Sequence, residues 1–317
     1  MTDTQNEVFK TPVSKIRLFE HGAPGSQNLK LTRKYYTEDM PDGRVKHIVQ
    51  NITDPDIVPY IPDGIGNSTD RQRIPAVLII PGGAFRRLVY NFEGEDVAKW
   101  LNSMGIAAFV LECRLPSDEH DNAEDVPLID AMRAMRVIRG RAQEFGIDEA
   151  KIGVMGFSAG GFMAALLSTA YESDVYADYK YKDEYDKLSA RPDFAVCSYP
   201  VISIDDCIEA GKRYMSEEQV LERISDGKAK ILHKYNPDKL VRPDMPPVFI
   251  CETDDDRTTL SENSVGFYMA ARKAGVSAEL HIFRTGGHGY GCGDDFAQTG
   301  EWKVLFTKWI KSIGIIS

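Results

Sequence analysis

The segment with the clearest capacity for chemistry is residues 151–167, KIGVMGFSAGGFMAALL. Its centre, residues 156–160, reads Gly-Phe-Ser-Ala-Gly and has the pattern G-x-S-x-G. The two glycines leave room for a turn so sharp that the hydroxyl of Ser158 stands clear of a sheet, where it can act as a nucleophile. The alternative interpretation is a glycine-rich turn whose serine has no chemical role, because five letters alone are a weak signal.

A nucleophilic serine needs a base that removes its proton, and the base needs a carboxylate that holds it in one tautomer. His288 lies in a glycine-rich loop, residues 286–291, directly after a predicted strand, whereas the other five histidines lack that placement. The acid can come from residues 253–257, Thr-Asp-Asp-Asp-Arg, which also follow a predicted strand. From the residues alone, three aspartates compete for this role, and a solvated acidic loop or a helix N-cap region is the alternative.

A further loop of interest follows the apolar run 76–80 and reads Pro-Gly-Gly-Ala-Phe at residues 81–85. Its glycines free the backbone to point N–H groups into a cleft, as in loops that bind the oxyanion of an acyl-transfer reaction. The helix predicted after Ser158 would direct its own unpaired N–H groups, and the positive end of its dipole, at the same oxygen. The alternative is an ordinary Pro-Gly turn.

Strands and helices alternate along the chain, which predicts a mostly parallel sheet with helices on both faces. Because the carboxyl ends of parallel strands lie at one edge of a sheet, we expect the loops that carry the serine, the acid and the histidine to meet there. The predicted strands are 76–80, 106–111, 152–155, 194–199, 247–252 and 278–283, and the predicted helices, besides the one after Ser158, are 93–104, 126–145, 262–274 and 301–313.

Composition limits the class of protein. With 317 residues, 43% of them hydrophobic, the chain can bury a large core, and we expect one α/β domain with insertions. The net charge of −10 argues against binding to nucleic acid or to anionic membranes. The first ten residues, MTDTQNEVFK, are polar, and no stretch approaches the roughly 18 apolar residues of a membrane span, so the expected location is the cytoplasm.

The cysteines and carboxylates give little support for a metal or a disulfide. The five cysteines have no zinc-ligand spacing, and Cys113, Cys197 and Cys251 fall in or beside apolar runs, so we expect buried free thiols. No histidine or second carboxylate cluster with ligand spacing lies near the acidic turn. No metal is therefore expected.

Residues 1–75 are rich in Pro, Gly, Asp and Asn and predict an N-terminal arm with possible edge strands at 14–19 and 44–52 and a loop at 59–73. Residues 76–317 form the predicted catalytic domain, with insertions at about 171–190 and 205–240. The first insertion carries five tyrosines, and the second is charged and helix-like. One or both can form a cap over the site, although a solvated helical excursion is the alternative for the first.

In these motifs and in longer segments, the chain resembles the bacterial α/β-hydrolases of the acetylxylan-esterase-like family, which are related to the hormone-sensitive-lipase-like esterases. The matching segments cover nearly the whole length: APG at 23–25, PGGAF, EGEDVAKWLNSMGIAAFVLECRLP, PLIDAMRAMRVIRGRAQEFGID, KIGVMGFSAGG, RPDFAVCSYPV, PPVFICETDDD and SENSVGFYMAARKAGVSAELHIFRTGGHGYG. The resemblance implies an α/β-hydrolase fold with Ser158 as nucleophile and His288 as base. It places the acid on Asp256, with Asp255 in reserve. It also implies oxyanion donors on the backbone N–H groups of Ala159 and of Gly83 or Ala84.

Three positions depart from the pattern of the family. Ala84 replaces the third glycine that is usual in the loop, which is tolerable if its φ is negative. Phe162 stands where relatives often carry a histidine. Arg257, next to the expected acid, can lower the pKa of Asp256 and draw that carboxylate away from His288.

The functional hypothesis is a serine carboxylester hydrolase that removes small acyl groups, acetyl in particular, from xylo-oligosaccharides or related sugars through an acyl-enzyme. Its partner is a small-molecule ester, and no cofactor is required. Phe85, Tyr90 and Tyr290 flank the expected site in the sequence and are candidate pocket residues. Two alternatives stay open: an amidase or peptidase of the same fold, and a catalytically silent α/β-hydrolase that binds a ligand. The oligomeric state is left open.

Overall fold

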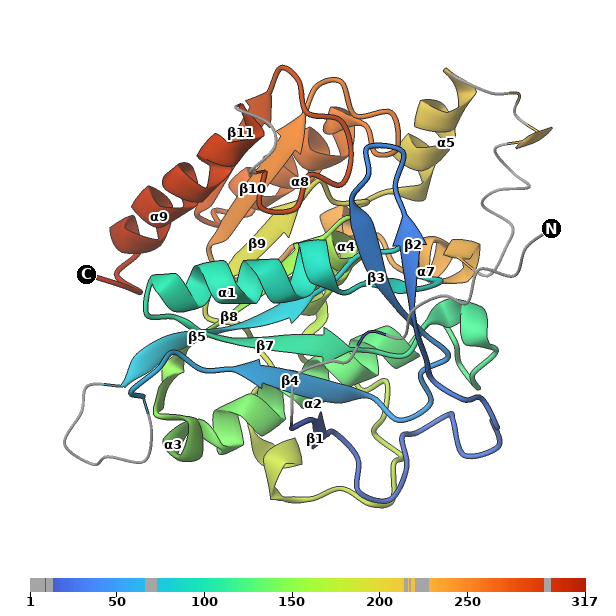
Figure 1. Cartoon of the computed structure of the whole chain (residues 1–317), viewed down its shortest axis with the longest axis vertical. Coiled ribbons are helices and arrows are strands. Elements are labelled where there is room, and N and C mark those ends of the chain that lie inside the picture. The colour runs from blue at the N-terminus through green and yellow to red at the C-terminus, as the bar shows by residue number, and fades with distance from the viewer. Residues whose placement is uncertain are drawn as a thin grey trace.

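A computed structural model describes residue 9 and residues 14–65, 73–213, 216, 218–219, 228–293 and 298–317. An eight-stranded sheet in the order β1-β4-β7-β5-β8-β9-β10-β11 runs through the molecule (Figure 1). In this order the six strands β7, β5, β8, β9, β10 and β11 are parallel to one another, whereas β4 is antiparallel to β7 and to β1 at one edge. The prediction of a mostly parallel sheet is therefore confirmed.

Each strand predicted for the central sheet is present; β11 has the predicted ends, and each of the others is shifted at one or both ends. β5, β7 and β10 are apolar or buried over nearly their whole length, as expected for strands covered on both faces. The strands of this sheet are β1 (Ile16–Arg17), β4 (Asp56–Tyr60), β5 (Ile74–Ile80), β7 (Ala107–Glu112), β8 (Ile147–Phe157), β9 (Ala195–Ser198), β10 (Val248–Thr253) and β11 (Ala278–Phe283).

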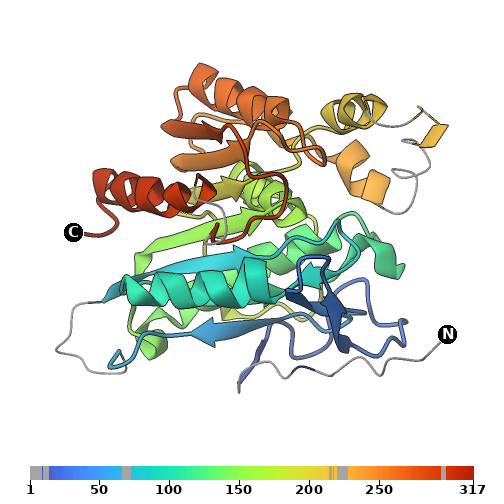
Figure 2. The same cartoon turned by 45° about the horizontal axis from the view of Figure 1, so that its top comes forward.

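Helices cover both faces of the sheet. In Figure 1, α1 and α9 lie in front of it and α2, α4 and α8 behind it, and Figure 2 shows the same layers from a tilted view. The helices are α1 (Asp96–Ser103), α2 (Val126–Gly140), α3 (Ala142–Phe145), α4 (Ala159–Ala170), α5 (Ile204–Lys212), α7 (Lys228–Lys234), α8 (Ser261–Lys273) and α9 (Trp302–Ser312), with a π-helical turn η1 (Asn91–Glu95) and 3₁₀ turns η2 (Pro116–Asp118), η3 (Glu184–Lys187), η4 (Pro237–Lys239) and η5 (Thr299–Glu301).

The single helix predicted over 126–145 is two helices. α2 ends at Gly140, and a short α3 follows after Arg141. A side chain at Gly140 would overlap the ring of Tyr185, so the glycine is needed for close packing, and it also weakens the helix where it ends. Leu128, Met132 and Met135 are fully buried, and they belong to the core as the helical spacing predicts.

The N-terminal arm contains more strand than the sequence predicts. β2 (Lys34–Asp39), β3 (Val45–Gln50) and β6 (Leu88–Val89) form a separate three-stranded sheet. The loop predicted at 59–73 is wrong at its start, because Pro59 and Tyr60 belong to β4 and pair with β7. A proline is tolerated at position 59 because β1 pairs with Asp56 and Ile57 and does not extend as far as Pro59. No backbone N–H is therefore needed from residue 59 on the side of β4 that faces β1.

The two insertions lie in different places. The first packs along α2: Arg133 pairs with Asp183 and Asp186, and η3 reaches the end of the helix at Gly140. In the described part of the second insertion, α7 packs against η2. Its Lys234 lies 2.7 Å from Asp125, just before α2. The first insertion therefore lies on the flank of the sheet, and the second reaches the start of α2.

Two further expectations concern the whole chain. Cys113, Cys197 and Cys251 are buried free thiols, as predicted. Burial raises the pKa of Cys251 to about 12, which keeps it protonated and inert at neutral pH. Within the described residues, every helix is too short or too polar to cross a membrane.

Candidate active site

Ser158 occupies the turn between β8 and α4, at the carboxyl edge of the sheet. Its φ of 54° and ψ of −118° are a strained conformation for a residue with a side chain. A Cβ on Gly156 would overlap the backbone of Gly160, and a Cβ on Gly160 would overlap the carbonyl of Ile80. Both glycines are therefore required by close packing, which is the reason for their spacing around the serine.

The structure brings Ser158, His288 and Asp256 together. Nε2 of His288 lies 2.8 Å from Oγ of Ser158, and Nδ1 of His288 lies 2.6 Å from Oδ2 of Asp256. The side chain of His288 is 21% exposed, whereas that of Asp256 is fully buried. A small molecule can thus reach the serine and the imidazole but not the carboxylate, so the arrangement can deprotonate the serine and hold the resulting imidazolium.

Asp256 lies in the turn after β10, and hydrogen bonds from the backbone of that turn fix its carboxylate. Oδ1 accepts the N–H groups of Thr258 and Thr259, at 2.7 and 3.0 Å, and Oδ2 accepts the hydroxyl of Thr259 at 2.9 Å. Burial by itself raises the pKa of this carboxyl group, but the hydrogen bond with His288 and those from the backbone outweigh it, and the pKa is lowered below its ordinary value. Asp256 is therefore ionised at neutral pH.

Asp255 and Arg257 are the charged neighbours of Asp256 in this turn. Oδ1 of Asp255 accepts the N–H of Gly287, 2.8 Å away, in the loop that carries His288. Arg257 is exposed, and Oδ2 of Asp256 lies 2.6 Å from Nδ1 of His288 beside it. The carboxylate of Asp256 is therefore not drawn away from His288 in this geometry. Thr259 was missed by sequence reasoning, although its place three residues after an aspartate is a signal for such a turn.

The expected oxyanion donors lie in two adjoining segments. Within the described residues, the N–H groups of Gly83, Ala84 and Ala159 donate to no protein acceptor, so they remain available to a ligand oxygen. The condition set for Ala84 is not met, because its φ is +59° and that of Phe85 is also +59°. Alanine can adopt this conformation at a cost of roughly 1–2 kcal/mol relative to glycine, and contacts with the surrounding residues must offset that cost.

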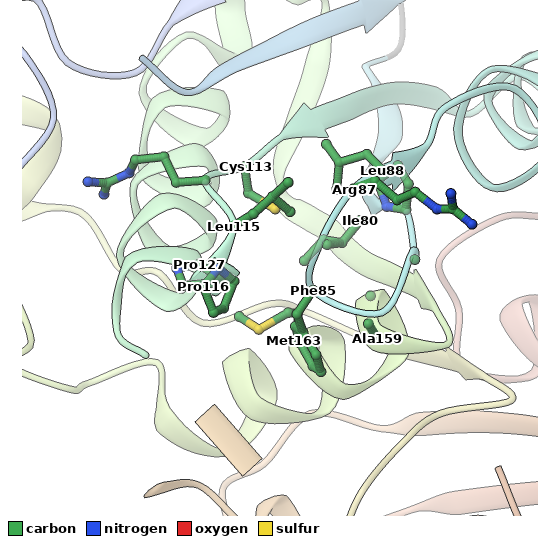
Figure 3. Close-up of a pocket in the computed structure, with 14 residues that line it drawn as sticks. Ile80, Phe85, Arg87, Leu88, Cys113, Leu115, Pro116, Pro127, Ala159 and Met163 are labelled. Atoms are coloured by element: carbon green, nitrogen blue, oxygen red, sulfur yellow. The ribbon is translucent and has the colours of Figure 1, made fainter. Parts of the chain in front are cut away.

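A small apolar pocket lies beside Ala159, between the ends of β5 and β7 and the starts of α2 and α4 (Figure 3). Its volume is about 10 Å³, room for about one water molecule. Figure 3 shows Phe85 and Met163 on one side and Cys113 and Leu115 on the other. The pocket can therefore accept a group of methyl size next to the expected oxyanion donors.

The three candidate pocket residues have different positions. Phe85 lines the pocket, and its ring packs edge-to-face on Phe162 with centroids 5.5 Å apart. Tyr90 is fully buried, and its hydroxyl lies 3.1 Å from that of Tyr60. Tyr290 is also buried and packs against Tyr199, with ring centroids 4.5 Å apart. Neither Tyr90 nor Tyr290 lines this pocket.

Three buried residues around the site have no counterpart in the sequence-based expectations. Burial raises the pKa of Glu93, and burial together with the charge of Asp256 raises the pKa of Glu252 well above its ordinary value. Burial also raises the pKa of Tyr199, whose hydroxyl lies 3.0 Å from Glu93. Glu93 is one of several acidic residues at the start of a predicted helix, where such residues are common. The sequence around it therefore gives no signal that its side chain is buried.

The described residues contain no cluster of three histidines, cysteines or carboxylates suited to a metal ion.

Comparison with known proteins gives relatives over most of the chain. An acetylxylan esterase of Xylanibacter ruminicola is 31% identical over 240 residues, which are 75% of this chain and 45% of that protein. An endo-1,4-beta-xylanase B of Butyrivibrio fibrisolvens is 31% identical over 71% of this chain and 34% of its own. The chain thus spans less than half the length of these curated relatives.

A solved structure matches from end to end. The acetyl ester-xyloside bifunctional hydrolase of Caldicellulosiruptor lactoaceticus is 35% identical, with a TM-score of 0.72, over 96% of this chain and 97% of that one. The predicted α/β-hydrolase fold and the resemblance to acetylxylan-esterase-like proteins are confirmed. The BD-FAE family model matches residues 65–270, well over half of the sequence, and the chain therefore belongs to the BD-FAE family.

Proposed function

We propose that this chain is a serine carboxylester hydrolase that removes small acyl groups, acetyl above all, from xylo-oligosaccharides or related sugars. The observation that carries the proposal is the pair of contacts from His288, at 2.8 Å to Ser158 and 2.6 Å to Asp256. The names of the relatives, an acetylxylan esterase and an acetyl ester-xyloside hydrolase, support acetylated xylose-based sugars as the substrate class.

The proposed reaction has two halves. Oγ of Ser158 attacks the ester carbonyl carbon while Nε2 of His288 takes the hydroxyl proton, and Asp256 stabilises the imidazolium. The tetrahedral oxyanion accepts hydrogen bonds from the N–H groups of Ala159 and of Gly83 or Ala84. The intermediate collapses, the C–O bond to the sugar breaks, and His288 gives its proton to the departing alcohol. Water then attacks the acyl-enzyme in the same way and releases the carboxylic acid.

The pocket beside Ala159 supports a preference for short acyl groups. With a volume of about 10 Å³ it can hold the methyl group of an acetyl ester, whereas each added methylene needs space that Met163 and Leu115 occupy. We further propose that the second insertion forms part of the rim of the site. Its Lys234 bonds to Asp125, which lies two residues before the pocket residue Pro127.

An acyl-length series tests the proposed function. We expect kcat/KM for p-nitrophenyl esters to fall by about tenfold or more from acetate to butanoate, and further to octanoate, because longer chains do not fit the pocket. Acetate release from acetylated xylo-oligosaccharides, measured beside the series, tests the sugar. Hydrolysis of amino-acyl p-nitroanilides faster than of any ester would contradict the proposal and identify an amidase.

Replacing Met163 with alanine is expected to broaden the acyl preference. Met163 is buried in the wall of the pocket, so the shorter side chain leaves space for a longer acyl group. The ratio of kcat/KM for butanoate to that for acetate should rise by about tenfold or more. The same substitution at Met269, which is 59% exposed on α8, is the matched control and should leave the ratio unchanged. Equal ratios in the two variants would place the acyl group elsewhere.

A further inference from the structure

Glu93 is a buried carboxylate that the proposed reaction does not use. It lies in the π-helical turn η1, and its Oε2 accepts the N–H of Gly82 at 2.8 Å. A Cβ on Gly82 would lie 2.7 Å from Oε2 of Glu93 and 2.9 Å from the Cβ of Ser158. The carboxylate of Glu93 and the nucleophilic turn therefore pack on the same glycine, which immediately precedes the expected oxyanion donors.

Tyr199 joins Glu93 to the loop of the histidine. Its hydroxyl donates to Oε1 of Glu93 at 3.0 Å and accepts the N–H of Gly291, also at 3.0 Å. Its ring lies edge-on to the imidazole of His288, with centroids 5.1 Å apart and an angle of 68° between the planes. Tyr199 itself has a φ of 37°, a conformation that only firm packing maintains in a tyrosine. One side chain thus contacts both Glu93 and the loop that carries the base.

The loop 81–85 needs such support because it is strained. Gly83, Ala84 and Phe85 have φ values of 133°, 59° and 59° in succession. Strained residues keep their conformation only where surrounding contacts fix it. The carbonyl groups of Gly82 and Gly83 accept hydrogen bonds from the N–H groups of Val89 and Arg86, at 3.0 and 3.2 Å. The N–H of Gly82 is the group that bonds to Glu93, and through it the loop is connected to Tyr199.

We propose that Glu93 and Tyr199 form a positioning pair that fixes the oxyanion donors of loop 81–85 relative to His288, through the path Gly82, Glu93, Tyr199 and Gly291. The proposal rests on the esterase function proposed above. The pair acts through its neighbours and contacts no reacting atom. Its effect should therefore fall on the step in which the oxyanion forms, and it should lower kcat while leaving KM nearly unchanged.

Three variants distinguish the effect of the hydrogen bonds made by Glu93 and Tyr199 from the effect of the negative charge of Glu93. Tyr199→Phe removes the hydroxyl but keeps the ring beside His288, and we expect kcat for p-nitrophenyl acetate to fall by about tenfold or more with KM within about threefold. Glu93→Ala should lower kcat further. Glu93→Gln keeps an oxygen for Gly82 and supplies an N–H₂ group for the Tyr199 hydroxyl, so kcat should stay within about threefold of the wild type.

Tyr176→Phe is the matched control. The Tyr176 hydroxyl is also buried and donates to a carboxylate, Asp186, at 2.9 Å, but it lies in the insertion that packs along α2. This variant should lower Tm without changing kcat, when kcat is normalised to active sites counted with a fluorophosphonate. Full kcat in Tyr199→Phe, or equal losses in Glu93→Gln and Glu93→Ala, would overturn the positioning pair. A wild-type chain that hydrolyses no ester would overturn the proposed function and this proposal with it.

Discussion

Replacing Ser158 with alanine is expected to lower kcat for p-nitrophenyl acetate by about 10⁴-fold or more. The hydroxyl lies 2.8 Å from Nε2 of His288, so the variant loses the nucleophile and leaves the base without a proton to remove. The N–H groups of Ala159 and Gly83 would still bind the substrate oxygen, and they account for the activity that remains. Initial rates at saturating substrate measure the effect.

Ser168→Ala is the matched control for this change. Ser168 is a buried serine of α4, the helix that follows Ser158, and its hydroxyl donates to the carbonyl of Ala164 at 2.7 Å. It should keep kcat within about twofold of the wild type, because it lies three turns from the site. A loss below tenfold in Ser158→Ala would rule out Ser158 as nucleophile. A native chain that resists labelling by a fluorophosphonate would favour the silent ligand-binding alternative.

Replacing Asp256 with asparagine is expected to lower kcat by about 10³–10⁴-fold. Asparagine has nearly the same shape, but an amide cannot hold Nδ1 of His288 protonated, nor can it stabilise the imidazolium. Because Oδ1 can still accept the N–H groups of Thr258 and Thr259, the turn should keep its fold. The loss should therefore appear in kcat with little change in Tm, and both quantities should be measured on the same preparation.

Asp255→Asn separates the two neighbouring aspartates. Oδ1 of Asp255 accepts the N–H of Gly287, and the carbonyl oxygen of asparagine can do the same, so we expect a loss of no more than about threefold. The contrast between the two variants is the informative result. Small and equal effects at the two positions would mean that the carboxylate of the triad comes from another part of the chain.

Local patterns in the sequence predict much of the framework of the site. The apolar run before Ser158 and the small residues after it indicate a strand, a tight turn and a helix, and the structure has β8, the turn and α4 there. The loops of Asp256 and His288 follow β10, which is buried along its whole length, and β11, a partly exposed edge strand in which apolar and polar residues mix. Period and composition suffice for the buried strands, because parallel strands covered on both faces have a simple pattern.

Other features depend on contacts between distant residues, which no local pattern reports. The choice of Asp256 over Asp255 is set by which of them faces His288 after the turn has formed. The positive φ of Ala84 is imposed by packing of the loop, since alanine by itself favours negative φ. Glu93 turns inward because Gly82 and Tyr199, which are 11 and 106 residues away, supply its two hydrogen bonds.

The order of strands in the sheet also has a consequence for biosynthesis. The serine is translated well before the histidine, and the histidine follows β11, which is the strand at one edge of the sheet. A growing polypeptide on the ribosome therefore carries the nucleophile for a long interval without its base. Under the proposed reaction, it cannot cleave esters until translation has passed residue 288 and β11 has paired with β10. The proposed esterase activity would therefore appear late in maturation, once the β11 edge of the sheet is complete.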